Sequence, residues 1–225
     1  MTVSTNSSSA YLMYSVFKAE VPLPDADERA EMARSVNQEI ENIDGLNLRG
    51  WYDVSGYRAD ADLMGWWWGP TAESVQQAYQ TFRASDLGWF FAPVWSQVGA
   101  HRPAEFNPDH VPAFLEGKDP KGYLCVYPFV RSYDWYILPD EERSTMLRDH
   151  GLAARDFTDV LPNTVASFGL GDYEWLLGFE ADDVARIVDL MRALRATQAR
   201  LHVREEVPFY TGPRGDLDQI VARLP

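Results

Sequence analysis

Residues Gly122–Phe157 read GYLCVYPFVRSYDWYILPDEERSTMLRDHGLAARDF and predict one strand that leads into one helix. The run Tyr123–Tyr127 is apolar or aromatic, which favours a half-buried strand whose successive side chains point to opposite faces. If Pro128 leaves the pleat intact, one face carries Tyr123, Cys125, Tyr127, Phe129 and Arg131. Because proline cannot donate to a ladder, an edge or a bulge is expected at that position.

The helix predicted downstream begins at Pro139, and three acidic residues in its first turn suit the positive end of the helix dipole. Its apolar stripe consists of Met146, Leu147, His150, Ala153, Ala154 and Phe157. His150 lies in the middle of the stripe, and an imidazole on the core side of a helix needs a hydrogen-bond partner or a metal. On spacing alone, a hydrogen-bonded core histidine is the favoured interpretation.

The composition describes a chain of 225 residues, 46% hydrophobic and 13% aromatic, enough for one large domain or two small ones. With 20 basic and 34 acidic residues, the net charge of −14 argues against nucleic acid or an anionic membrane as the main partner. A local basic patch could still bind a small anion. The single cysteine, Cys125, excludes an intramolecular disulfide and favours a cytoplasmic protein, and we find no signal peptide or membrane-length apolar run.

The order of predicted elements is β-α-β-β-α-β, and it occurs twice. The first set spans residues 11–16, 25–43, 48–55 and 63–68, a helix from 70 onward, and 87–98; the second spans 123–129, 139–157, 164–168, 173–179, 182–196 and 201–207. A local repeat relates Trp66, Ala72, Val75, Tyr79 and Arg83 to Trp175, Ala181, Val184, Val188 and Arg192 at one constant offset. We therefore predict an α+β fold of tandem ferredoxin-like units, of the dimeric α+β barrel type, with antiparallel sheets packed together and helices outside.

The predicted domain organisation has four parts. A disordered tail occupies residues 1–9, an N-terminal ferredoxin-like unit 10–98, a connector 99–120, and a C-terminal ferredoxin-like unit 121–225. A connector of that length is often functional.

Histidines are the first candidates for chemistry, at positions 101, 110, 150 and 202. No pair has chelating spacing, so a closed zinc site is disfavoured. Haem iron needs only one protein imidazole, and His150 would suit that role. Tyr127, Trp135 and Arg131 are further candidates, although on sequence pattern alone packing or solvation is the favoured interpretation of each. An arginine such as Arg131 could bind a carboxylate in bidentate fashion.

Several motifs together resemble the coproheme decarboxylases of the chlorite dismutase-like superfamily, most closely their actinobacterial branch. They are YPFVRSYDWY and LRDHG, with YLMYSVFKAE, LMGWWWGPT and REEVPFYTG, and they span nearly the whole chain. The set is specific, although no single motif would suffice. The resemblance implies a tandem pair of ferredoxin-like units, usually assembled as a homopentamer, with the haem site in the C-terminal unit.

The resemblance also implies a reaction. Iron coproporphyrin III (coproheme) would be both substrate and redox cofactor. Hydrogen peroxide would oxidise the iron, a tyrosyl radical would take hydrogen from a propionate, and carbon dioxide would leave behind a vinyl group. Two rounds, at propionates 2 and 4, would give haem b by way of a three-propionate intermediate.

Site residues follow from the same resemblance. His150, in LRDHG, matches the proximal iron ligand, and Tyr127, in the YP motif, matches the radical tyrosine. Arg131 falls where the family has a basic residue near the propionates, and Trp135 is expected to line the porphyrin edge. His110, in NPDHVPAF, matches a distal histidine that would deprotonate peroxide, a task that suits a group with a pKa near neutral.

One absence distinguishes the branches of the superfamily. Chlorite dismutases carry a distal arginine after the proximal histidine, and other decarboxylases a glutamine; this chain has neither between Asp156 and Ala185. Chlorite decomposition is therefore disfavoured, while Asn163 or Thr164 could contact a distal ligand. Three alternatives stay open: a non-catalytic haem or coproheme binding protein, a chlorite dismutase-like haem peroxidase, and a cofactor-free monooxygenase of the same barrel type.

Overall fold

The computed structural model describes residues 10–107 and 111–224. The predicted disordered tail, residues 1–9, lies outside this part of the chain. Within the two ranges, every helix falls short of the length and apolar content that crossing a membrane requires.

The first unit has the ferredoxin-like order that the sequence predicts. It consists of β1 (Tyr11–Ala19), α1 (Ala26–Glu41), β2 (Asn47–Asp53), β3 (Leu63–Gly69), α2 (Ala72–Ala84), the 3-10 helix η1 (Gly88–Phe90) and β4 (Phe91–Ala100). The strands pair antiparallel in the order β4-β1-β3-β2. Side-chain caps fix both helix starts, because Asp25 accepts from the first amides of α1 and Thr71 accepts from Ser74 N in α2.

The second unit repeats this order. It consists of β5 (Tyr123–Arg131), η2 (Trp135–Ile137), α3 (Asp140–Ala154), β6 (Leu161–Ala166), β7 (Trp175–Ala181), α4 (Val184–Arg195), η3 (Gln198–His202) and β8 (Val203–Glu205). Its strands pair antiparallel in the order β8-β5-β7-β6.

The offset between the two units corrects the repeat taken from the sequence. Four of the six equivalent strands and helices begin 112 positions apart, from 11 to 123, 63 to 175, 72 to 184 and 91 to 203, and the other two, from 26 to 140 and from 47 to 161, begin 114 apart. The pairs chosen from the sequence, such as Trp66 and Trp175, are 109 apart and so are not structural equivalents. Residues three apart share one helix face, so a helical pattern matches almost equally well at either offset.

One further strand, which was not predicted, and one further strand pairing close the fold. Strand β9 (Tyr210–Gly215) pairs with β2 on one side and β5 on the other, while β4 meets β6 through Ala100 and Ala166. The two sheets therefore join at both edges, and eight strands of the described chain form a closed ring.

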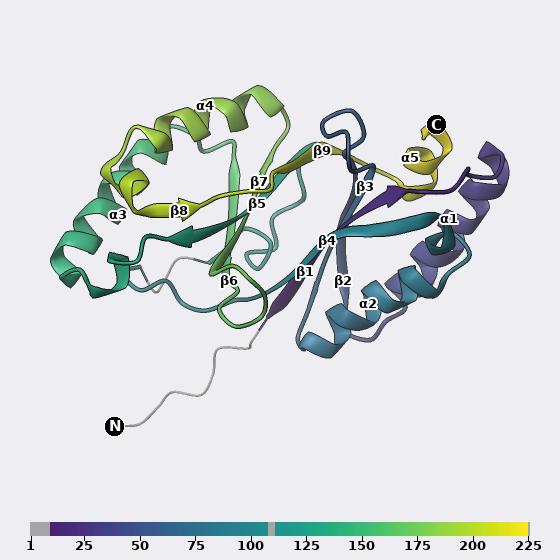
Figure 1. The fold of residues 1–225 in the computed structure, drawn as a ribbon, viewed down its shortest axis with the longest axis horizontal. Coiled ribbons are helices and arrows are strands. Elements are labelled where there is room, and N and C mark those ends of the chain that lie inside the picture. Colours follow the sequence, from purple (N-terminus) through teal and green to yellow (C-terminus); the bar gives the residue numbers. More distant parts are fainter. Residues whose placement is uncertain (1–9, 108–110, 225) are drawn as a thin grey trace.

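The last helix of the described chain packs on the first unit. Helix α5 (Leu217–Arg223) contacts α1, and its buried Leu217, Ile220 and Val221 belong to the apolar cluster of the first unit. The chain therefore returns to the N-terminal half after β9. Figure 1 shows α1, α2 and α5 at one end of the molecule and α3 and α4 at the other, with the strands between them.

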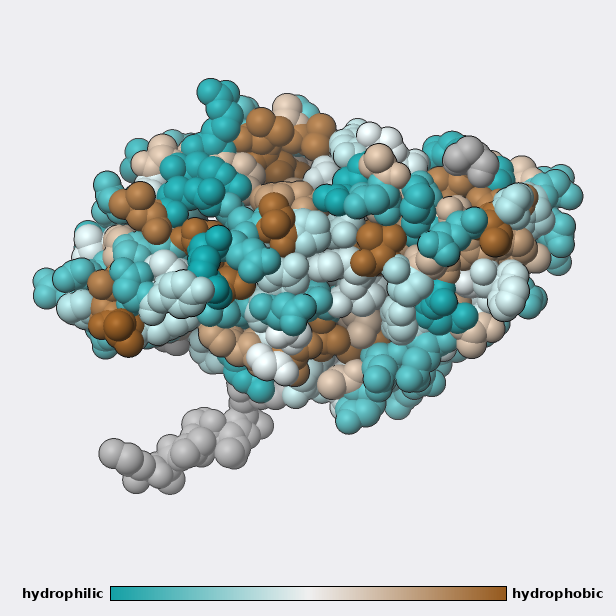
Figure 2. All heavy atoms as spheres, in the orientation of Figure 1, coloured by the Kyte–Doolittle hydropathy of each residue, from teal (hydrophilic) through white to brown (hydrophobic). Residues whose placement is uncertain are grey.

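The core is divided into three apolar clusters by the alternation of the strands. Leu124 and Val126 point into the ring, with Tyr14, Trp66 and Leu176, whereas Cys125 and Tyr127 point outward to the cluster under α4. Most of the face in Figure 2 is hydrophilic, in keeping with the net charge of −14, and apolar side chains gather over α4.

Candidate functional site

Two adjoining cavities lie between the outer face of the second sheet and helices α3 and α4. The larger has a volume of about 610 Å³ and the smaller of about 60 Å³, and their walls share His150, Leu177 and Leu194. Together they have the size of a small-molecule site. The larger wall is mainly apolar and includes Ala154, Phe157, Leu161, Phe179 and Leu190.

Helix α3 explains why this space is not filled. Of the predicted stripe, His150, Ala154 and Phe157 line the larger cavity, whereas Met146 and Leu147 are half-buried and line neither cavity. Arg143 is the one fully buried residue of the helix. The part of the stripe around His150 therefore borders a cavity instead of a packed core, which is the arrangement expected for a bound apolar ligand.

Strand β5 brings three predicted residues to the smaller cavity. Tyr127, Phe129 and Arg131 all line it, which confirms that alternate residues of this strand share one face. Pro128 pairs with β7 on one side. On the other side of β5, pairing with β9 ends at Val126 and pairing with β8 begins at Val130, where the register shifts. Pro128 lies between these two pairings, so no strand on that side needs the backbone N–H that proline lacks.

His150 has one ring nitrogen engaged with the protein. Its Nδ1 lies 3.2 Å from Thr197 Oγ1, so the predicted hydrogen-bond partner exists. Burial, with a smaller contribution from the positive charge of Arg131, lowers the pKa of His150 below its ordinary value. The ring is therefore neutral at neutral pH, which is the form that binds a metal.

Tyr127 is held by packing rather than by a base. Its side chain is 4% exposed, its ring stacks on Phe209 with centroids 4.5 Å apart, and its hydroxyl donates to Met191 Sδ at 3.5 Å. Burial raises the pKa of Tyr127 well above that of a free tyrosine. The phenol therefore keeps its proton over the whole physiological pH range.

Arg131 is a half-buried cation held by aromatic rings. Its guanidinium carbon lies 4.2 Å from the ring centre of Trp135 and 4.8 Å from that of Phe129, and burial lowers its pKa. In the described part of the chain, no carboxylate lies within ion-pair distance of it. Trp135 is 2% exposed and lies behind Arg131 instead of lining either cavity.

The smaller cavity contains charged residues that sequence reasoning missed. Arg195 and Arg200 both pair with Glu206, the former at 3.1 Å, and all three line the wall. With Arg131, the three arginines leave this wall positive in an otherwise acidic chain. The sequence gives no signal for this cluster, because it is assembled from α4, η3 and the segment after β8.

The connector borders the larger cavity both before and after residues 108–110, which lie outside the described part of the chain. Asn107 and Lys118 line the wall. Glu105 forms an ion pair with the buried Arg143 of α3, with a shortest N–O distance of 2.8 Å. Phe114 N donates to Asn163 Oδ1 at 2.9 Å. His110, the predicted distal base, lies outside the described residues.

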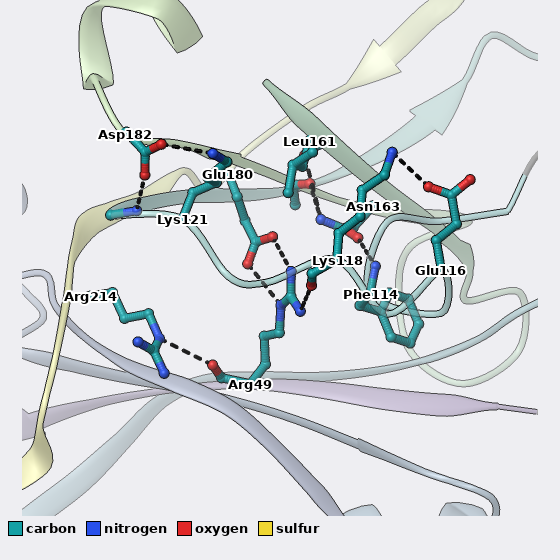
Figure 3. A network of polar contacts seen from close by, with 12 residues as sticks. Arg49, Phe114, Glu116, Lys118, Lys121, Leu161, Asn163, Glu180, Asp182 and Arg214 are labelled. Carbon is teal, nitrogen blue, oxygen red and sulfur yellow. Dashed lines mark hydrogen bonds and ion pairs between the residues drawn. The ribbon is translucent and has the colours of Figure 1, made fainter. Parts of the chain in front are cut away.

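A polar network inside the ring anchors the second part of the connector (Figure 3). Arg49 on β2 forms two hydrogen bonds with Glu180 on β7, at 3.0 and 2.6 Å, and also donates to Lys118 O at 2.5 Å. Glu180 is fully buried, and burial raises its pKa despite this pairing.

The same network separates the two distal candidates. Asn163 faces the inside of the ring and also donates to Leu161 O and Gly178 O. Thr164, the next residue, points to the opposite face and lines the larger cavity.

Metal binding at this site would depend on a non-protein group. Among the described residues, no three His, Cys, Asp or Glu side chains are grouped to hold an ion. Of the histidines that the structure describes, His150 is the one that lines the two cavities, so the remaining ligands of an iron bound there would have to come from a macrocycle such as a porphyrin.

Comparisons with known proteins agree with this geometry. The family model for chlorite dismutase matches residues 29–215. A coproheme decarboxylase of Mycolicibacterium smegmatis is 54% identical over 225 aligned positions, which cover 98% of this chain and 96% of that protein.

Solved structures give the same fold. A double mutant of chlorite dismutase from Candidatus Nitrospira defluvii superposes with a TM-score of 0.83 at 22% identity, over 94% of each chain. The same enzyme in complex with imidazole gives a TM-score of 0.80 at 21% identity, over 94% of this chain and 93% of the other. At such identities the likeness shows the fold alone.

Proposed function

This chain belongs to the chlorite dismutase family, and we propose that it decarboxylates iron coproporphyrin III with hydrogen peroxide to give haem b. The relative with 54% identity bears the name of that activity. The observation that carries the proposal is the meeting of His150, Tyr127 and Arg131 at one pair of joined cavities.

The cavity residues fit such a substrate. Apolar side chains of the sheet and of α3 and α4 form the walls that a flat macrocycle would contact. His150 would hold the iron, and the positive wall of the smaller cavity would receive carboxylates. Once bound, the substrate supplies the redox centre that reacts with peroxide.

Each decarboxylation must balance in atoms and electrons. A propionate group loses one carboxyl as carbon dioxide and one hydrogen from the adjacent chain, which leaves a vinyl group. Hydrogen peroxide accepts the two electrons and two protons and becomes two waters, so one peroxide is consumed for each propionate.

Tyr127 would carry the hydrogen transfer. The phenol is protonated, buried and beside the cavity, so it has a hydrogen atom to lose and is shielded from water. After oxidation, the Tyr127 radical would take a hydrogen atom from the propionate chain and return to the phenol. Its neighbour on the same strand face, Arg131, would fix the carboxylate, since its guanidinium forms no ion pair within the described residues; the nearby Glu174 accepts from the backbone amide of Arg131 instead.

Trp135 acts on Arg131 in this proposal. Its ring lies 4.2 Å from the guanidinium and would keep Arg131 directed at the substrate. We propose this positioning role for Trp135 in place of direct contact with the porphyrin edge.

His110 would serve as the distal base. The connector is pinned to α3 at Glu105 and to β6 at Phe114, and residues on both sides of the segment line the larger cavity. These contacts support a distal position for His110, with Thr164 on the sheet side. Deprotonation of peroxide suits an imidazole.

The setting of the reaction is also a proposal. We expect a cytoplasmic homo-oligomer, a pentamer as in the resembling family, with neither nucleic acid nor a membrane as partner. The net charge of −14 supports the last two expectations.

Addition of ferric coproheme and then peroxide, followed by mass spectrometry, tests the function. We expect a Soret band, then loss of two carboxyl groups. A Soret band without any mass change would indicate a haem carrier, and oxygen release from chlorite a chlorite dismutase-like activity. Failure to bind coproheme would favour a cofactor-free barrel enzyme.

A further inference from the structure

His150 is the first member of a short hydrogen-bond chain. Its Nδ1 lies 3.2 Å from the hydroxyl oxygen of Thr197, a residue 47 positions away at the end of α4. The Thr197 hydroxyl in turn donates to the backbone carbonyl of Leu194 at 2.8 Å. Neither the motif around His150 nor any spacing in the sequence indicates this contact.

The direction of the chain follows from counting protons. A hydroxyl has one proton and two lone pairs, and the proton of Thr197 is used on Leu194 O. Toward His150 the Thr197 oxygen can therefore only accept, so Nδ1 must carry the ring proton. We propose that Thr197 is a positioning residue that fixes His150 in the Nδ1–H tautomer and leaves the Nε2 lone pair to bind iron.

The far end of the chain strengthens this effect. Leu194 lies in the last turn of α4, and its carbonyl also accepts from the backbone amides of Ala196 and Thr197. Helix C-termini carry partial negative charge. The Nδ1–H group of His150 is connected to this negative charge through the Thr197 hydroxyl. A hydrogen bond of this kind makes the other ring nitrogen, Nε2, a stronger electron donor, as it does when a carboxylate or a backbone carbonyl accepts from a metal-bound histidine.

Replacement of Thr197 could also disturb the local backbone, and the test must distinguish this effect from loss of the hydrogen bond to His150. Thr197 follows the last turn of α4 and precedes η3. Valine matches the shape of threonine and lacks the hydroxyl, while serine keeps it. A shift seen with valine and reversed with serine thus reports on the hydroxyl.

The experiment is nitrogen-15 NMR of histidine-labelled apoprotein, at a pH where the ring is neutral. The signals of His150 are identified by their loss in His150→Gln. We expect Nδ1 to be protonated and Nε2 to be bare in the wild type and in Thr197→Ser. In Thr197→Val we expect the Nε2–H form, which an unconstrained histidine side chain favours in water. Thr81→Val, on α2 at the other end of the molecule, should leave the tautomer unchanged.

Coproheme affinity gives the second measurement, and this part rests on the proposed function. Loss of such a support typically weakens metal binding about 10- to 100-fold, so we expect a drop of this size in Thr197→Val and recovery in Thr197→Ser. An Nε2–H form in the wild type, or an unchanged tautomer in Thr197→Val, would overturn the inference. The tautomer is measured without substrate, so the two results can be separated. If the NMR spectra show the expected tautomers but the protein does not bind coproheme, the result counts against the proposed function and not against the role of Thr197.

Discussion

Replacement of the buried Arg49 should show how strongly the free energy of unfolding depends on one ion pair inside the ring. Glu180 is fully buried, and Arg49 supplies both of the charged hydrogen bonds that compensate its carboxylate. Arg49→Met keeps most of the side-chain volume and removes the ion pair of Glu180, which then keeps only the hydrogen bond of Asn163 and the more distant charge of Arg214. Breaking a buried pair in this way costs about 3–5 kcal/mol, which for a chain of this size lowers Tm by roughly 10 °C.

The pH dependence of the loss has a definite sign. The pKa of Glu180 is already raised by burial, and Arg49 is the main influence that lowers it. In Arg49→Met the folded-state pKa rises further, while that of the unfolded chain stays near about 4.3. A group with a raised folded-state pKa stabilises below its unfolded pKa and loses that stabilisation as pH rises through the folded value. The variant should therefore regain stability on going from about pH 8 to about pH 5, relative to the wild type.

Urea unfolding at the two pH values measures both effects. Arg49→Met with Glu180→Leu should recover most of the loss, because an apolar pair replaces the stranded charge. Arg34→Met removes the partner of Asp218 in an exposed pair 3.1 Å apart and should cost under about 1 kcal/mol. A loss in Arg49→Met no larger than in this control, or a double variant no more stable than the single one, would refute the reasoning.

Two further sites give independent predictions. Arg131→Gln should weaken coproheme binding about 10- to 100-fold, because a half-buried charged donor is lost, whereas Arg34→Gln should not. Equal affinities of wild type and Arg131→Gln in a Soret titration would remove Arg131 from the site. Gly178→Ala should cost about 1–3 kcal/mol in urea unfolding, since a Cβ there would lie 2.4 Å from Tyr14 Oη. Gly151→Ala, in open space on α3, should instead gain about 0.5–1 kcal/mol, and a loss there would contradict the helix geometry.

The sequence predicted the elements that carry strong periodicity. Alternate residues of β5 do share a face, and the C-terminal part of the predicted α3 stripe does line the cavity, through His150, Ala154 and Phe157. The stripe could not reveal that it borders a cavity, because periodicity shows which face is apolar and not what covers it. Strand β9 escaped prediction because Tyr210–Gly215 contains Pro213 and two glycines, and it forms through pairing with two distant strands.

Positions near the site show where sequence reasoning ends. Asn163 and Thr164 are adjacent, and an uncertainty of one residue in a strand reverses the face of every side chain. Only the register of β6 against β7 places Thr164 in the cavity and Asn163 inside the ring. Thr197 and the cluster around Glu206 depend on tertiary contacts between α3, α4 and η3, for which no local pattern exists.

The most direct test of the proposed activity compares wild type and Tyr127→Phe in the coproheme and peroxide assay, followed by mass spectrometry. The substitution keeps the stacking on Phe209 and removes only a weak hydrogen bond to Met191, so folding and coproheme binding should be nearly unchanged. We predict that the wild type removes two carboxyl groups from the substrate and that Tyr127→Phe removes none. Equal product from the two proteins would contradict the assignment of hydrogen transfer to Tyr127, and no product from the wild type would contradict the decarboxylase itself.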